Sequence, residues 1–317
     1  MQRIIMLEQA DSQVQKKIID ISLPVINPKN KNNPNMSSTV GRRPEWLKVK
    51  APGGNNFANI KKMMRAKSLH TVCEEAHCPN IGECWSNGTA TFMILGDTCT
   101  RSCAFCAIKT GRPNTVNIFE PLDVARSVQR MDLKHAVVTS VTRDELLDEG
   151  AEIWAQTIIK IRELNPDTTV EVLIPDMNGR KELLKIIFDA RPDIMNHNVE
   201  TVPRLYKRIR PQAIYQRSLD VLEYSKELGL RTKTGIMVGI GETDDEIIEL
   251  MKDLVKINVD VFTIGQYLQP TVKHAPVDRF VHPDQFAKFK TIGEQLGLDH
   301  VESGPLVRSS YHAETHI

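Results

Sequence analysis

From residue 89 onward, short apolar stretches alternate with longer amphipathic stretches along most of the chain. The amphipathic stretches carry apolar residues at three- and four-residue spacing, which is typical of helices that bury one side. Apolar strands that alternate with such helices indicate a parallel sheet covered by helices. We therefore expect an α/β fold, a partial (βα)6 TIM-like barrel. The expected strands are 90–96, 135–141, 168–175, 193–200, 232–240 and 259–268, and the expected helices are 121–131, 151–164, 180–190, 216–228 and 244–257.

A dinucleotide-binding fold is the weaker interpretation, because no G-x-G-x-x-G follows an early strand. In a barrel of parallel strands the active site lies at the carboxyl ends of the strands. Polar residues and glycines follow several of the expected strands, so we expect them to meet at one mouth. They are Thr139, Ser140, Arg143, Asp144, Asp176, Asn196, His197, Asn198, Glu200, Gly239, Gly241, Glu242 and Gln266. Thr243 and Glu246 form the pattern of a capping box before the helix 244–257.

The start of the chain differs in composition from the rest. Residues 1–41 include INPKNKNNPNMSS, which has too few apolar groups to pack, so we expect a disordered tail there. The net charge of +1 argues against a nucleic-acid binder. No apolar run approaches the roughly 20 residues of a membrane span, and the first residues lack the pattern of a secretory signal. We expect a cytoplasmic protein that binds neither nucleic acid nor membrane.

Cys99, Cys103 and Cys106 lie within eight residues, directly after the first expected strand. Iron–sulfur clusters are held by cysteine thiolates in short loops, usually four per cluster. Three thiolates leave one iron open, and an open coordination position indicates chemistry rather than a structural site. The alternatives are structural zinc, held by three cysteines and a histidine, and disulfides. Zinc is disfavoured because paired C-x-x-C spacings and a nearby H-x-x-x-H are absent, and disulfides are disfavoured in a chain without a secretory signal.

Cys73, Cys78 and Cys84 form a second group with different spacing, before the first expected strand. We expect this group to hold a separate cluster against the barrel. The chain has no seventh cysteine, so the missing ligand must be another residue, a substrate or nothing. His77 is a neighbour, but a surface or packing role is the more common one for such a histidine.

The pattern of Cys99, Cys103, Phe105 and Cys106 resembles the signature of the radical S-adenosylmethionine (SAM) superfamily. The resemblance implies that the open iron binds the methionine part of SAM. One electron then splits the cofactor into a 5′-deoxyadenosyl radical, which removes hydrogen from carbons that no general base could deprotonate. The cofactor carries this step, and the protein supplies binding and geometry.

Further motifs narrow the resemblance to the lipoyl synthase family. The run VCEEAHCPNIGECWSNGTATFMILGDTCTRSCAFCAI is similar to that family, as are GRP at 111–113, TSVTRDEL, NHNVETVPRLY, GIMVGIGET, GQYLQP and GPLVRSSYHA. The similarity extends from about Arg42 to Ala313. It implies an extension at 42–88 that carries an auxiliary cluster, a barrel at 89–300, and a C-terminal segment at 301–317 that closes on this cluster.

The resemblance implies two [4Fe–4S] clusters, SAM, and insertion of two sulfur atoms at C6 and C8 of an octanoyl chain. The auxiliary cluster, held by Cys73, Cys78, Cys84 and a serine of RSSY, would be the sulfur source. In an extended backbone only one of two adjacent serines reaches a given side, so we expect Ser310 as the ligand, with Ser309 as the alternative. Cys99, Cys103 and Cys106 would hold the radical-forming cluster.

The implied partners are octanoylated lipoyl carrier domains, namely the E2 subunits of 2-oxoacid dehydrogenases and the glycine cleavage H protein. A ferredoxin- or flavodoxin-type electron donor and an iron–sulfur carrier that rebuilds the cluster are also implied. The competing functions are a radical SAM enzyme that acts on a free small molecule, as biotin synthase does, and a non-enzymatic iron–sulfur carrier or sensor.

The implied SAM contacts are Phe105, Thr139, Ser140, Arg143, Asn196, Asn198, Glu200 and Gly239. Alternatives stay open for several of these residues and their neighbours. Gly239 and Gly241 also fit a tight turn from strand to helix. Met237 is more typical of a core residue, and His197 of a buried, hydrogen-bonded histidine. Arg210 and Tyr215 are more typical of residues that dock a helix than of substrate contacts.

Overall fold

The computed structural model describes residues 43–48, 70, 71, 78, 80, 81, 84, 91–311 and 313. The chain divides into two units, Met1–Thr39 and Val40–Ile317, and every described residue lies in the second. The expected tail at 1–41 is therefore outside the described residues, and the expected extension at 42–88 is described only in part. No helix in the described ranges is both long and apolar enough to cross a membrane.

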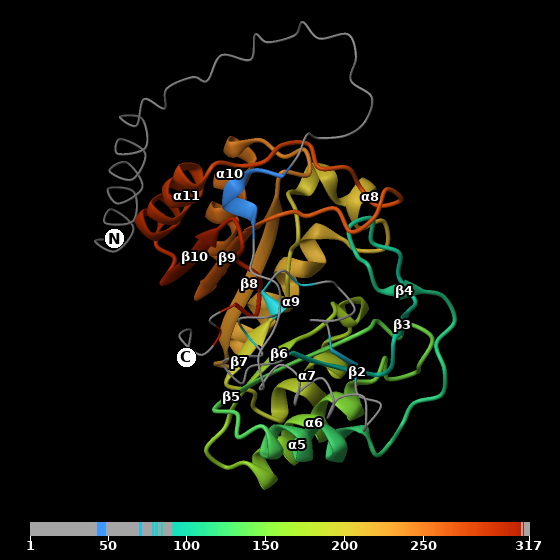
Figure 1. Ribbon diagram of the computed structural model, residues 1–317. Coiled ribbons are helices and arrows are strands. Elements are labelled where there is room, and N and C mark those ends of the chain that lie inside the picture. Colours follow the sequence, from blue (N-terminus) through green and yellow to red (C-terminus); the bar gives the residue numbers. More distant parts are fainter. Residues whose placement is uncertain are drawn as a thin grey trace, which may run out of the picture. The chain divides into compact units, whose positions relative to one another are not determined.

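The central element is an eight-stranded sheet in which seven strands run parallel (Figure 1). These seven strands pair in chain order, and the short β1 adds to β2 in the antiparallel direction. The sheet order is β1 (His70–Thr71), β2 (Thr91–Ile94), β5 (His135–Ser140), β6 (Thr169–Leu173), β7 (Ile194–Asn196), β8 (Arg231–Val238), β9 (Val261–Gln266) and β10 (His300–Gly304). A second, two-stranded sheet pairs β3 (Thr98–Cys99) with β4 (Lys109–Thr110).

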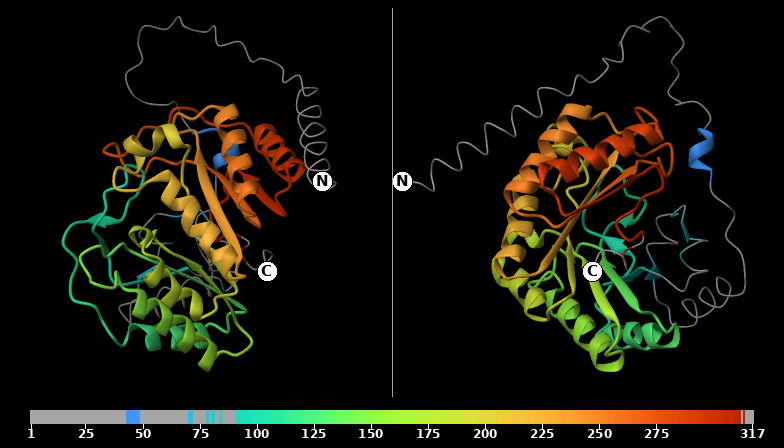
Figure 2. Two further views of the ribbon diagram at one scale, coloured as in Figure 1. Left: turned by 180° about the vertical axis from the view of Figure 1, so that it is seen from behind. Right: turned by 90° about the vertical axis from the view of Figure 1, so that its left-hand side faces the viewer.

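The helices cover one face of the curved sheet (Figure 2). Strand residues such as Val138, Val172 and Phe262 pack with Trp154 and Leu250 from the helices in one buried core. The helices are α5 (Glu120–Arg130), α6 (Ala151–Leu164), α7 (Lys181–Asp189), α8 (Tyr206–Ile209), α9 (Tyr215–Glu227), α10 (Asp244–Lys256) and α11 (Pro283–Leu296), with 3₁₀ turns at Glu45–Leu47, Met177–Gly179 and Pro203–Leu205. All six expected strands and all five expected helices are present, and so is the capping box of Thr243 and Glu246.

Chain-ordered parallel strands covered by helices, with β1 and β10 at two separate edges, form a partial barrel, as expected. The pair α11 and β10 extends the predicted pattern by one unit. Gly293 lies in the last turn of α11 and weakens the helical pattern, but a Cβ there would lie 2.8 Å from a methyl group of Val301 on β10. Close packing thus requires glycine at this position. β10 itself contains only one fully buried apolar residue, Val301, so it lacks the apolar run of the other strands.

The face of the sheet opposite the helices carries a buried ion pair. Side chains alternate along a strand, so Glu171 of β6 points away from Val170 and Val172, which pack in the helix-facing core. Lys233 Nζ lies 3.0 Å from Glu171 Oε2, and Asn196 donates to Glu171 Oε1 at 2.9 Å. Glu171, Lys233 and Asn196 are all fully buried. Burial opposes ionisation of Glu171, but the Lys233 ammonium, His135 and Asn196 together outweigh burial and lower the pKa of this carboxyl.

Replacement of Lys233 by Met should lower the free energy of unfolding by about 3–5 kcal/mol, because it leaves the Glu171 carboxylate buried without its partner. Without Lys233 the pKa of this carboxyl rises, so the deficit should shrink as the pH is lowered and the carboxyl takes up a proton. The measurement is urea unfolding followed by the fluorescence of buried Trp154 at pH 8 and pH 5.

The matched control is Lys185→Met, which removes an exposed ion pair with Asp189 and should change the midpoint little. Equal midpoints for Lys233→Met and the wild type would show that the buried pair does not stabilise the sheet.

Candidate active site

The cysteine loop follows β2 directly and is framed by the pairing of β3 with β4 (Figure 1). Its position is fixed by main-chain hydrogen bonds to three other segments of the mouth. Thr100 N donates to Thr142 O at 3.1 Å, Ala104 N to Ile209 O at 2.8 Å, and Ala275 N to Ala104 O at 2.8 Å. The loops after β5, β7 and β9 therefore hold the loop that carries Cys99, Cys103 and Cys106.

Arg101, between the first two cysteines of the loop, binds the carboxyl ends of two strands. Its guanidinium donates to Asp144 after β5, with Nη2 and Oδ1 2.8 Å apart, and its Nη1 lies 2.7 Å from Oδ1 of Asp176 after β6. Arg101 is 7% exposed and Asp176 is fully buried. Burial opposes ionisation of Asp176, but the Arg101 guanidinium lowers the pKa of its carboxyl. The cysteine pattern does not predict this role, although Arg101 is the one charged residue between Cys99 and Cys106.

The three thiols of the loop are partly exposed, and those of Cys99 and Cys106 accept hydrogen bonds from the backbone. The N–H groups of Arg101 and Thr142 donate to Cys99 Sγ at 3.4 and 3.3 Å, and the N–H of Ile108 donates to the thiol of Cys106. Burial raises the pKa of Cys103, and it raises the pKa of Cys106 to about 12. As free thiols these groups would be neutral, so a metal must displace their protons when it binds. Sulfur ligands with N–H donors fit an iron–sulfur cluster.

Within the described residues, no three His, Cys, Asp or Glu side chains converge on a point where a single metal ion could sit. This statement includes the thiols of Cys99, Cys103 and Cys106.

The second cysteine group is described at Cys78 and Cys84, which are both partly buried; Cys73 and His77 lie outside the described residues. The C-terminal segment, residues 305–311, contacts this group. Asn80 Nδ2 donates to Leu306 O at 2.7 Å, and the Arg308 guanidinium lies close enough to Cys78 to act on its pKa. Burial outweighs this charge and raises the pKa of Cys78. The segment that carries RSSY is therefore adjacent to the second group.

Ser309 and Ser310 differ in their contacts. The side-chain amide of Asn198, just after β7, donates to Ser309 Oγ at 2.6 Å. The Ser310 hydroxyl forms no hydrogen bond with the described residues and is partly exposed. Ser309 is thus held against the barrel, whereas Ser310 is available to another ligand.

Several expected SAM contacts lie together at the carboxyl ends of β5, β7 and β8. Buried polar atoms without a hydrogen-bond partner in the described part of the chain include Ser140 Oγ, Asn196 Oδ1 and Asn198 Oδ1. A Cβ at Gly235 would lie 2.3 Å from Thr263 Oγ1 and 3.1 Å from Asn198 Oδ1, so the backbone of β8 approaches the same region closely. Such unpartnered groups fit a site that a polar cofactor completes.

Glu200 and Thr139 belong to the same end of the sheet. Glu200 has a left-handed backbone, with φ of 63°, and pairs with Ile236 of β8 in an isolated bridge. Burial raises the pKa of its carboxyl, although Arg210 and Asn198 oppose the shift. Thr139 Oγ1 donates to Leu173 O at 2.9 Å and links β5 to β6. Phe105 packs against the hydrophobic core from the cysteine loop.

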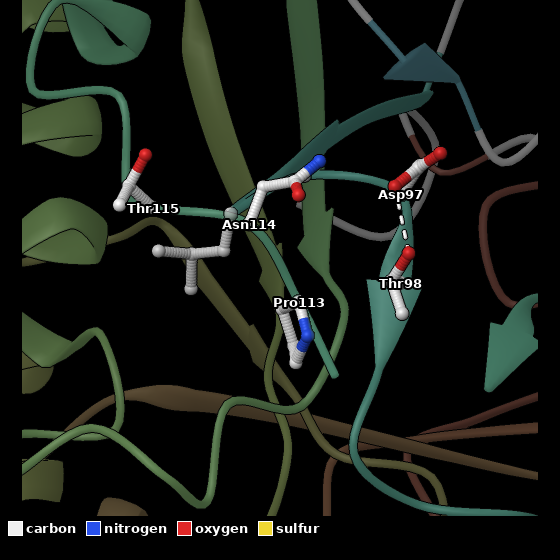
Figure 3. A pocket seen from close by; sticks show the side chains of 7 residues that line it. Asp97, Thr98, Pro113, Asn114 and Thr115 are labelled. Carbon is white, nitrogen blue, oxygen red and sulfur yellow. Dashed lines mark hydrogen bonds between the residues drawn. The ribbon is translucent and has the colours of Figure 1, made fainter. Parts of the chain in front are cut away.

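Arg143 makes contacts other than the expected ones. Its guanidinium donates to Leu95 O and to Asn114 O at 2.8 Å each, and to Glu145 at 2.6 Å. Leu95 and Asn114 are among the residues that line a cavity of about 160 Å³, together with Gly96, Asp97, Thr98, Pro113 and Thr115 (Figure 3). Arg143 therefore ties the GRP segment to the end of β2.

Gly239 serves the turn that follows β8. Its φ is 89°, its N–H donates to Glu242 at 2.6 Å, and a Cβ would lie 2.3 Å from both Arg279 O and Gln266 Nε2. The space beside this glycine is filled by protein, which agrees with the turn interpretation.

The residues interpreted as structural have structural contacts. His197 is buried, and its two ring nitrogens lie 2.8 Å from Ile174 O and 3.0 Å from Ser218 Oγ. Arg210 donates to the carbonyls of Asn198 and Val199 and to the hydroxyl of Tyr206. Tyr215 packs edge-on against Tyr206, and its hydroxyl donates to Asp253. Met237 packs against the core.

Comparison with known proteins agrees with this geometry. The radical SAM superfamily matches residues 93–254, and the N-terminal domain of lipoyl synthase of the radical SAM family matches residues 26–78. The lipoyl synthase of Rubrobacter xylanophilus is 58% identical over 273 residues, which cover 86% of this chain and 85% of that protein. The lipoyl synthase of Bacillus subtilis is 55% identical over 279 residues, and the mitochondrial one of Nematostella vectensis is 54% identical over 276; each match covers 87% of this chain and 94% of the relative.

Solved structures share the fold at low sequence identity. The FeFe-hydrogenase maturase HydG of Carboxydothermus hydrogenoformans matches with a TM-score of 0.54 and 12% identity, over 71% of this chain and 64% of that one. Methylornithine synthase matches with a TM-score of 0.51 and 12% identity, over 67% and 71%. Radical SAM enzymes use a [4Fe–4S] cluster and SAM, which the first cysteine group fits. With its N-terminal and barrel regions both matched, and at 54–58% identity over most of its length, the chain belongs to the lipoyl synthase family of the radical SAM superfamily.

Proposed function

We propose that this enzyme inserts two sulfur atoms, at C6 and C8, into an octanoyl chain bound to a lysine of a lipoyl carrier domain. The observation that carries the proposal is the path of the C-terminal segment. Within four residues, this segment accepts a hydrogen bond from Asn80, brings the Arg308 guanidinium close enough to Cys78 to act on its pKa, and accepts a hydrogen bond from Asn198 just after β7. One segment therefore brings the second group to the mouth that already contains the first.

The two cysteine groups are assigned different tasks. When bound, the cluster on Cys99, Cys103 and Cys106 supplies the electron that splits SAM to start the radical reaction, and the auxiliary cluster supplies sulfur. The residues around the first group keep its loop in place and offset negative charge at the thiolates. Arg101 fixes the loop to β5 and β6, and the positive charge of Arg210 lies close enough to Cys103 to favour its thiolate.

The auxiliary cluster is assigned to Cys73, Cys78, Cys84 and Ser310. Arg308, whose guanidinium acts on Cys78, favours the thiolate form there. Ser309 is held by Asn198, so Ser310 is the serine free to bind iron. An alkoxide ligand is a harder donor than a thiolate and is lost more readily from iron, which suits a cluster that gives up sulfur.

SAM is assigned to the polar groups at the ends of β5, β7 and β8. Ser140, Asn198 and Glu200 would hold the polar groups of SAM. Ser140 Oγ and Asn198 Oδ1 are buried without a hydrogen-bond partner among the described residues, and burial raises the pKa of the Glu200 carboxyl. Phe105 shapes the site from the cysteine loop. Thr139, Arg143 and Gly239 act as positioning residues, since their polar groups bind other parts of the protein. Asn196 donates to Glu171, and its unpartnered Oδ1 would bind SAM.

Lipoyl synthases act on lipoyl carrier proteins, and the carriers proposed here are E2 subunits of 2-oxoacid dehydrogenases and the glycine cleavage H protein. A ferredoxin- or flavodoxin-type protein would supply electrons, and an iron–sulfur carrier would rebuild the auxiliary cluster. We propose the cytoplasm as the place of this reaction.

Incubation of the anaerobic, iron-loaded enzyme with SAM, dithionite and an octanoylated carrier domain should convert the carrier to its lipoylated form. Intact-mass spectrometry should show two sulfur atoms gained, and two hydrogen atoms lost once the dithiol product is oxidised to the disulfide. The same enzyme should leave free octanoate unchanged. Conversion of a free small molecule, with the carrier unchanged, would favour the biotin synthase-like alternative, and absence of SAM cleavage would favour a non-enzymatic protein.

Alanine substitutions should separate the two cysteine groups. Cys103→Ala should abolish both SAM cleavage and product, because the first cluster loses a ligand. Cys78→Ala should keep a substantial fraction of SAM cleavage, about a tenth or more, and lose product. Both are measured as 5′-deoxyadenosine and lipoylated carrier by chromatography, with circular dichroism to confirm that each variant is folded. Equal loss of cleavage in two folded variants would contradict the assignment.

The two serines should also differ. Ser310→Ala should reduce product at least about tenfold while cleavage continues, because the auxiliary cluster loses its fourth ligand. Ser309→Ala removes the acceptor for Asn198, so its main effect should be weaker SAM binding, seen as a raised KM. Mössbauer spectra of the purified variants report the auxiliary iron directly. If Ser309→Ala, and not Ser310→Ala, changed those spectra, Ser309 would be the ligand.

A further inference from the structure

Charge is unevenly distributed around the cysteine loop. The stretches 99–115, 203–217 and 268–277 together contain nine Lys or Arg residues and no Asp or Glu. The whole chain has 41 Lys and Arg against 40 Asp and Glu, so acidic residues are otherwise as common as basic ones. The absence of carboxylates from these three stretches is a local property of the mouth.

The three stretches are adjacent in space. Ala104 in the cysteine loop donates to Ile209 O, and its carbonyl accepts from Ala275 N, both at 2.8 Å. The side chains of Ser102 and Gln212 are joined at 3.0 Å. Figures 1 and 2 show the three stretches side by side next to α8 and β4. All three stretches therefore meet at the cysteine loop.

Five of the nine cations are engaged within the protein. Arg101 and Arg210 are buried. Arg204 pairs with Glu246, Arg217 pairs with Asp176, and Arg208 donates to Ile240 O.

The other four are exposed: Lys109, Arg112, Lys207 and Lys273. None of these four forms an ion pair with any residue that the structure describes. Unpaired cations on one surface attract negative charge from solution.

Two apolar side chains lie on the same surface. Val272 is 93% exposed and precedes Lys273, and Ile214 is 51% exposed at the end of the second stretch. An apolar centre with a charged rim is the usual composition of a protein–protein interface. We call Lys109, Arg112, Lys207, Lys273, Ile214 and Val272 the basic surface.

We propose that the basic surface is the docking site of a small acidic electron-transfer protein that reduces the cluster on Cys99, Cys103 and Cys106. The inference rests on the proposed function. The basic surface lies on the stretches that hydrogen-bond the backbone of the cysteine loop, at Ser102, Ala104 and Cys106. A protein bound there would be separated from the thiols only by this loop. The octanoyl chain of a carrier must instead reach the mouth near Cys78 and Asn198, where the C-terminal segment lies.

One electron is transferred at this surface. A reduced flavin of the partner is oxidised by one electron, from hydroquinone to semiquinone, and the cluster is reduced by one electron. No atom is exchanged between the two proteins. Charge complementarity would act mainly on the rate of association and should be screened by salt.

The test uses the full-length, iron-loaded enzyme and a double charge reversal, Lys207→Glu with Lys273→Glu. With reduced flavodoxin as the donor at low ionic strength, SAM cleavage should slow by at least about tenfold. The defect should shrink as salt is added. With dithionite, a small reductant that needs no docking, cleavage should stay at the wild-type rate. A matched control, Lys134→Glu with Lys288→Glu, changes the same amount of charge on exposed lysines outside the basic surface and should behave as wild type.

Four results would overturn the inference. Wild-type rates with flavodoxin would show that the basic surface is not used by the donor. An equal loss with dithionite would show that the substitutions damage the cluster site itself. In a third result, the variant cleaves SAM normally with both reductants but converts the octanoylated carrier poorly relative to a short octanoyl-lysine peptide. That result would assign the surface to the carrier instead. Failure of the wild-type enzyme to cleave SAM with dithionite would reject the proposed function, and the docking inference would fall with it.

Discussion

The buried contacts of Arg101 connect the cysteine loop to the sheet. A loop with three cysteines in eight residues has little apolar surface of its own to fix it in space. The Arg101 guanidinium is nearly inaccessible to solvent and is neutralised by Asp144 and Asp176, which follow adjacent strands. Removal of one partner of such a buried pair leaves an uncompensated charge, at a cost of about 3–5 kcal/mol. The position of the three thiols therefore follows from the parallel sheet, through one arginine.

The C-terminal segment has the corresponding role for the second cysteine group. β10 is the last strand of the sheet, and the residues after it turn back over the mouth. Gly265 of β9 permits this path, because a Cβ there would lie 2.1 Å from Val307 O. From this position the segment binds Asn198, and its Arg308 lies close enough to Cys78 to act on the pKa of that thiol. Gly265 and the RSSY motif are more than 40 residues apart in sequence, and both are needed for this position of the C-terminal segment.

The periodicity of the sequence predicts the six central strands and the five helices between them because each of these buries a regular apolar stripe. Periodicity does not predict the pair α11 and β10. Glycine at position 293 fits the close contact with Val301, although glycine has a low helix propensity. Spacing also predicts the cysteine groups, because covalent ligands must be close in sequence to share a short loop. Contacts between distant segments cannot be predicted in this way. The bonds from Arg101 to Asp176 and from Asn198 to Ser309 depend on strand order and on the path of the last segment. The same holds for Arg143, whose partners lie in the loop after β2.

The central claim is that one mouth holds two clusters with separate protein ligands. Iron and sulfide content of anaerobically purified protein tests it most directly. The account predicts about eight iron atoms per chain, from two four-iron clusters. It predicts about four in a variant with Cys78 and Cys84 replaced by Ala, with the first cluster retained. About four iron atoms in the wild-type protein, or none in that variant while it remains folded, would contradict it.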